Sequence, residues 1–128
     1  MKRTATAAAV LLAALATLTA CSSEPEPAAD APPYTVTEQD DTGNQRTVRV
    51  EVKTAERVED VFNAVADTLD DDAGWFVEIN CSTGGTAKAD NRLGNGRKAV
   101  GNIGAATTGL DEGETQFEAQ PNPECPAK

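Results

Sequence analysis

The sequence predicts a small α+β domain, in which an antiparallel sheet carries one main amphipathic helix and is braced by one disulfide. Three observations predict this class. Residues 47–53 alternate between valine and polar side chains, a pattern typical of a strand with one buried face. Five apolar side chains then follow at the spacing of one helical stripe, namely Val58, Val61, Phe62, Val65 and Leu69. Cys81 and Cys125 form an even pair in the body of the chain.

The first element is expected to be a β-hairpin. Tyr34 and Val36 alternate with threonines, and residues 40–44 (Asp-Asp-Thr-Gly-Asn) have the composition of a turn. Residues 47–53 then form the second strand. Its three valines, Val48, Val50 and Val52, share one face, so we expect this face to be buried and the opposite face to meet water.

The helix is expected after Thr54, which can cap it, and the acidic residues that follow suit the positive end of a helix dipole. Its apolar stripe should pack on the valine face of the hairpin. We expect the helix to end in the acidic run 70–72, with Gly74 as the stop. A calcium site in this run is disfavoured, because the sixth and twelfth positions counted from Asp70 are not the Gly and Glu that an EF-hand loop needs.

Residues 75–81 read as a third strand, in which Trp75 and Cys81 share the buried face. We expect residues 82–86 to form a loop. Residues 97–110 fit either a strand pair or a weak helix, and five glycines between 94 and 109 favour extended structure. A short strand at Thr115 to Ala119 should then bring Cys125 back to Cys81.

A disulfide between Cys81 and Cys125 is the expected role of these two residues. Closing a loop of roughly 45 residues stabilises a fold by about 4 kcal/mol in the chain-entropy model. That is a large contribution for a small domain with five aromatic residues.

The N-terminus has the features of an export signal. Lys2 and Arg3 precede 16 residues of Ala, Val, Leu and Thr, a length short of the roughly 20 apolar residues that a spanning helix needs. The run ends in Leu18-Thr19-Ala20-Cys21, which resembles the lipobox of bacterial lipoproteins. The resemblance implies cleavage before Cys21 and attachment of diacylglycerol to its sulfur, which would anchor the chain to the membrane.

These features predict three segments: a signal peptide over 1–20, a tether over 21–33 and the α+β domain over 34–128. Residues 22–33 contain four prolines, three acids and no large apolar side chain, so they cannot fold alone. At about 3.1 Å per residue such a tether would hold the domain roughly 30 to 40 Å from the bilayer. Over its whole length the chain resembles the small lipoproteins of actinomycete type, a resemblance that implies no particular ligand.

Charge and composition exclude several functions. Removing Lys2 and Arg3 leaves nine of the 11 basic residues against 21 acidic ones, a net charge of about −12 that disfavours nucleic acid as a partner. The chain contains no histidine, which removes His-dependent metal sites, nucleophile pairs and acid–base catalysis.

One cluster of basic residues is a candidate for binding an anion or a partner: Lys88, Arg92, Arg97 and Lys98 lie within eleven positions. Arginines bind anions through paired hydrogen bonds, and the glycines between them can expose backbone N–H groups. The alternative interpretation is that these charges pair with the protein's own acids or are solvated on a loop.

We therefore expect a monomeric lipoprotein, held by lipid on Cys21 at the extracytoplasmic face of the cell membrane. Its expected role is a non-catalytic binding or interaction module for an extracellular protein or an envelope polymer, without a cofactor or a metal. Two alternatives stay open. One is an inhibitor-like protein that presents a disulfide-braced loop to an extracellular protease, and the other is a small enzyme that uses carboxylates alone.

Overall fold

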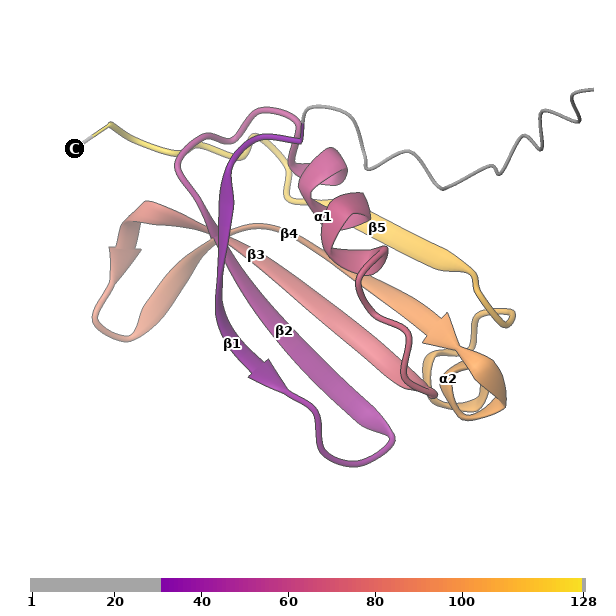
Figure 1. The fold of residues 1–128 in the computed structure, drawn as a ribbon. Helices are drawn as coiled ribbons and strands as arrows, with labels where there is room; N and C mark the ends of the chain where they lie inside the picture. The colour runs from indigo at the N-terminus through magenta and orange to yellow at the C-terminus, as the bar shows by residue number, and fades with distance from the viewer. Residues whose placement is uncertain (1–30, 128) are drawn as a thin grey trace, which may run out of the picture.

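The computed structural model describes residues 31–127 and shows one five-stranded mixed sheet with two helices. The strands lie side by side in chain order (Figure 1). This confirms the expected combination of sheet, helix and disulfide, but the sheet is not antiparallel throughout and a second helix is present. The elements are β1 (Tyr34–Asp40), β2 (Gln45–Val52), α1 (Val58–Ala66), β3 (Ala73–Thr86), β4 (Ala89–Val100), α2 (Gly101–Thr108) and β5 (Thr115–Ala119).

Strands β1 and β2 form the predicted antiparallel hairpin. In the turn, Gly43 has a φ of 72°, a conformation that glycine adopts without steric cost. The carboxylate of Asp40 accepts hydrogen bonds from the backbone N–H and the hydroxyl of Thr42. The valines of β2 are buried as predicted, at 0 to 1 % exposure.

Helix α1 lies across one face of the sheet (Figure 1), closest to β3, β4 and β5, and the predicted stripe is buried in the same core cluster as the β2 valines. Its bounds differ from the prediction. The Thr54 hydroxyl accepts a hydrogen bond from the Glu56 N–H in the turn before the helix, and the helix itself starts at Val58 and ends at Ala66. Gly74 is not its stop but a residue of β3, where residues of α2 leave no room for a side chain.

Strands β2 and β3 run parallel, which corrects the prediction of an antiparallel sheet. The physical reason is the connection between them. Helix α1 carries the chain back along the sheet, so that β3 starts beside the first residue of β2, with Gln45 opposite Gly74. The core forms in this crossover, where Phe62 and Trp75 are the two largest fully buried side chains.

Strand β3 is longer than predicted, because residues 82–86 belong to it rather than to a loop. It pairs antiparallel with β4, and the two strands meet again at Thr86 and Ala89 on either side of a tight turn. Gly84 has a φ of 80° in this extension. The hairpin projects beyond the rest of the sheet (Figure 1). Residues 82–86 are extended because β4 provides hydrogen-bond partners for this end of β3, and the local sequence pattern does not reveal that pairing.

Residues 101–108 form α2, which corrects the prediction of extended structure there. The glycines permit close packing instead of preventing the helix: a Cβ on Gly104 would collide with the backbone of Ala73 and Ala99. The Asp72 carboxylate accepts a hydrogen bond from the Ile103 N–H in the first turn, and Gly109 ends the helix with a φ of 76°. Strand β5 then follows with the predicted bounds.

The two helices cover different parts of the sheet. Helix α1 covers the face that carries the β2 valines, whereas α2 contacts Gly74 and Ala99 on the opposite face, at one end. The rest of that opposite face, called the open face below, is formed mainly by polar side chains from all five strands. Within residues 31–127, neither helix is long and apolar enough to cross a bilayer.

Candidate functional site

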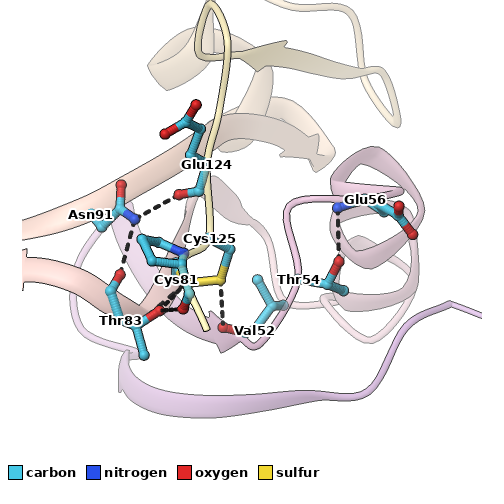
Figure 2. The surroundings of a disulfide bond; sticks show 9 residues. Val52, Thr54, Glu56, Cys81, Thr83, Asn91, Glu124 and Cys125 are labelled. Carbon is cyan, nitrogen blue, oxygen red and sulfur yellow. Dashed lines mark hydrogen bonds between the residues drawn. A yellow bond between two sulfur atoms is a disulfide. The ribbon is translucent and has the colours of Figure 1, made fainter. Parts of the chain in front are cut away.

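Cys81 and Cys125 form the predicted disulfide, with their Cα atoms 5.5 Å apart (Figure 2). Cys81 points into the core and is 7 % exposed, as its place in the strand alternation predicts. Around it the C-terminal segment is fixed further, because Asn91 Nδ2 donates hydrogen bonds to the carbonyls of Thr83 (2.9 Å) and Glu124 (2.8 Å). The Thr83 hydroxyl donates to the Pro126 carbonyl. The disulfide and these bonds together hold residues 124–126 against the base of the β3–β4 hairpin.

The proposed lipid site, Cys21, lies outside the described residues, as do the predicted signal peptide and most of the tether. The structure nevertheless shows whether Cys21 has a thiol partner within the chain, because it describes the other two cysteines. Cys81 and Cys125 are joined to each other, so neither is available to pair with Cys21. Every intramolecular thiol partner of Cys21 is thereby occupied.

The four basic residues of the sequence cluster are not brought together. Arg97 and Lys98 are neighbours in β4, so their side chains point to opposite faces of the sheet. Arg97 Nη1 donates to the Thr108 carbonyl at the end of α2 (3.0 Å), whereas Lys98 Nζ donates to the Ala66 carbonyl at the end of α1 (2.7 Å). Each cation therefore caps the C-terminus of a different helix, where the dipole favours positive charge.

The other two basic residues lie in different surroundings from each other. Arg92 lies on the open face, where Nε donates to Asn80 Oδ1 at 2.7 Å and Nη2 is 3.0 Å from Glu78 Oε2. Lys88 is exposed at the tip of the β3–β4 hairpin. Arg92, Arg97 and Lys98 thus have partners within the protein.

A line of alternating charges crosses the open face from β1 to β4. Glu38, Arg49, Glu78 and Arg92 follow one another across four strands, with N–O distances of 3.0 to 3.1 Å. The Glu38 charge, followed by the hydrogen bond and charge of Glu78, raises the pKa of Arg49 above its ordinary value. Exposed ion pairs of this kind contribute about 0 to 1 kcal/mol each, so the line defines the strand register more than it stabilises the fold.

The acidic run 70–72 has a structural role in two of its three residues. Asp71 Oδ2 is 2.7 Å from Arg46 Nη1, and Arg46 also lies over the Trp75 ring at 5.2 Å from its centroid. Asp72 caps α2, as described above. Residues 31–127 contain no group of three or more His, Cys, Asp or Glu side chains placed to hold a metal ion.

A hollow of about 310 Å³ opens on the open face beside α2. Two rows of side chains that run across β3, β4 and β5 line it. The first row is Phe76, Arg97 and Gln116, and the second contains Asn95 and Glu118, as the strand register requires. Arg97 Nε donates to Gln116 Oε1 at 2.9 Å, so that the floor of the hollow is ordered by its own hydrogen bonds.

Phe76 is the residue that the sequence prediction missed. It shares the open face with Glu78 and Asn80, and it is half-buried there although it is the one large apolar side chain that the described strands place on this face. The signal was present in the sequence. The strand alternation that places Trp75 and Val77 in the core places Phe76 on the polar face. A large aromatic ring on a polar face is unusual and therefore marks a candidate binding position.

Comparisons with known proteins identify no relative of this chain. No protein-family model, no curated protein and no solved structure matches it.

Proposed function

We propose that the mature chain is a lipoprotein, anchored by lipid on Cys21 at the extracytoplasmic face of the cell membrane, and that its domain is a non-catalytic binding or interaction module. The observation that carries the proposal is the order of features along the chain. An apolar leader ends in Leu18-Thr19-Ala20-Cys21, a proline-rich segment follows, and the two later cysteines are committed to a disulfide. Disulfides persist mainly outside the cytosol, which agrees with export.

The tether gives the domain room to act. Residues 22–33 would span roughly 30 to 40 Å in an extended proline-rich conformation, and β1 begins at Tyr34. Two or more acyl chains on one residue make anchoring stable, at about 0.8 kcal/mol per buried CH₂ group. The domain would therefore stay attached to the membrane and still reach partners beyond the lipid headgroups.

A binding role fits the residue types better than catalysis does. The chain has no histidine, and four charged side chains of the open face, Glu38, Arg49, Glu78 and Arg92, pair with one another. The proposed partners are an extracellular protein or an envelope polymer, not a nucleic acid, because the exported part carries a net charge of about −12. The domain acts as a monomer in this proposal.

Labelling with palmitate in the native cells tests the anchor. The wild-type chain should take up label and sediment with membranes. Cys21→Ser should take up none and either accumulate as precursor or be released, while Ser22→Ala, one residue on, should behave as wild type. Membrane-bound Cys21→Ser together with unlabelled wild type would refute the anchor.

Crosslinking in intact cells followed by mass spectrometry tests the binding role. The proposal expects the wild-type chain to crosslink reproducibly to one class of extracytoplasmic protein or polymer. A second sample of the same cells, denatured before the crosslinker is added, serves as the control. Equal capture by folded and denatured protein would contradict a folded binding surface.

A second candidate, an inhibitor of extracellular proteases, is favoured by one observation. The segment around Glu124 and Pro126 is held by the disulfide and by the side chains of Asn91 and Thr83, and a rigid exposed segment is what such an inhibitor presents. Titration against secreted proteases separates the two candidates. Stoichiometric inhibition that is lost in Asn91→Ala would support the inhibitor.

A further inference from the structure

We propose that the hollow beside α2 binds one neutral pyranose ring of an envelope polysaccharide. This inference rests on the proposed function, since it names the partner class of the proposed binding module. The hollow has a volume of about 310 Å³, which lies at the lower end of the range for small-molecule sites and suits one sugar ring. Its lining combines one aromatic ring with several polar groups.

Phe76 supplies the surface for stacking. The faces of a pyranose carry C–H groups, and an aromatic ring offers them an apolar face that carries partial negative charge. Phe76 is flanked by Thr47 on β2 and Arg97 on β4, so polar neighbours surround its ring on both sides. A ring in this position loses contact with water when a sugar covers it, which gives a free-energy reason for the site.

Two polar groups of the hollow, Arg97 and Gln116, are ordered by a hydrogen bond to each other before a ligand arrives. Arg97 donates to the Thr108 carbonyl and to Gln116 Oε1, which fixes the guanidinium plane and leaves N–H groups for hydroxyl acceptors. Asn95 adds an amide and Glu118 adds a carboxylate that accepts from hydroxyls. Ordered donors and acceptors reduce the entropy cost of binding a hydroxyl-rich ligand.

The charge balance selects a neutral sugar. Arg97 and Glu118 give the lining one positive and one negative group, and the positive one already faces two acceptors within the protein. An anionic ring would bring a second carboxylate near Glu118 in a domain with a large excess of acids. We therefore expect discrimination against uronic acids.

Titration of the isotopically labelled domain with methyl glucoside, followed by NMR, tests the proposal. We use up to about 50 mM ligand, which covers a dissociation constant on the order of 10 mM for a single ring. Backbone amide shifts should change in residues 94–97 and 115–118, and the Phe76 ring protons should shift upon stacking. Methyl glucuronoside, the same ring with a carboxylate, should bind more weakly.

Variants separate stacking from folding. Phe76→Leu keeps an apolar side chain but removes the ring, and it should lower the affinity for methyl glucoside by about tenfold. The NMR spectrum of this variant shows whether the domain is still folded. Glu38→Gln lies on the same face outside the hollow and should bind as wild type. Chitotriose, with N-acetylated rings, extends the test to a second neutral sugar.

Two results would overturn the inference. One is the absence of shifts in the hollow with both neutral sugars, and the other is tighter binding of the glucuronoside than of the glucoside. Neither result touches the proposed function, which is tested separately by palmitate labelling at Cys21 and by crosslinking in cells. A domain that ignores sugars but crosslinks to a protein would keep the function and lose this site.

Discussion

Gly96 of β4 and Phe62 of α1 are in direct contact, and the contact exists because Gly96 has no side chain. A Cβ atom on Gly96 would overlap the Phe62 ring, which also stacks on Phe117 of β5 at 5.3 Å between centroids. Helix α1 therefore lies close to the sheet at the position where β4 carries no side chain. Glycine has a poor strand propensity, but at position 96 the close packing of the helix on the strand requires it.

Gly96→Ala should consequently destabilise the domain by about 1 to 3 kcal/mol, the usual cost of forcing extra volume into a packed core. Urea denaturation measures the effect. The matched test is a double-mutant cycle with Phe62→Leu, which removes the ring edge that the new methyl group meets. A coupling of about 1 kcal/mol is expected, and additive effects would contradict the contact.

Lys98→Met should cost about 1 kcal/mol, because it removes the hydrogen bond from Nζ to the last carbonyl of α1. The change keeps most of the apolar stem. Lys88→Met, at the exposed hairpin tip, is the control and should change stability by less than about 0.5 kcal/mol. Equal effects of the two substitutions in thermal unfolding would show that the cap contributes nothing.

Reduction of the disulfide should remove about 4 kcal/mol of stability, since the bond closes a loop with a sequence separation of 44. The free energy of unfolding is measured in urea with and without dithiothreitol. The double variant Cys81→Ala, Cys125→Ala should show the reduced stability and no response to the reductant. An unchanged midpoint for the reduced wild type would mean that the bond does not stabilise the fold.

Asp40 should make stability depend on pH in the acid range. The side-chain and backbone hydrogen bonds from Thr42 lower the pKa of Asp40, so the folded state favours the ionised form. The stabilisation is therefore complete above the pKa of the unfolded chain, about 4, and is lost as the pH falls through the lower folded value.

Thermal unfolding between neutral pH and acid measures this dependence. Asp40→Asn should flatten the acid limb of the curve. Thr42→Val, which removes the hydroxyl donor and keeps the backbone N–H, should flatten it in part. A steeper acid limb in Asp40→Asn would reverse the assigned sign.

The parts of the fold that depend on local patterns could be predicted from the sequence. Alternating valines identified β2, the stripe containing Phe62 identified α1, and the bounds of β5 were predicted correctly. These patterns record which face of an element is buried, and burial dominates the choice of secondary structure at these positions.

The errors occurred where partners distant in sequence decide the structure. Helix α2 forms in a glycine-rich segment because Gly104 packs on Ala73 and Ala99 and because Asp72 caps its first turn. Residues 82–86 become strand because β4 pairs with them. The parallel pairing of β2 and β3 was predictable in principle, since a helix that connects two adjacent strands returns the chain to the starting edge.

The candidate site shows the same division. Four basic residues close in sequence suggested one patch, but adjacent strand residues face opposite ways, and Arg97 and Lys98 accordingly cap different helices. The alternation that revealed the core also contained the position of Phe76 on the open face. The hollow around it depends on the order of β3, β4 and β5, which no local pattern specifies.

The most direct test of the account is the intact mass of the protein extracted from the membranes of its native cells. We predict a chain that begins at Cys21 and carries the mass of a diacylglycerol group, with Cys81 and Cys125 oxidised. A chain that retains residues 1–20, or that begins at residue 21 with an unmodified thiol, would contradict it.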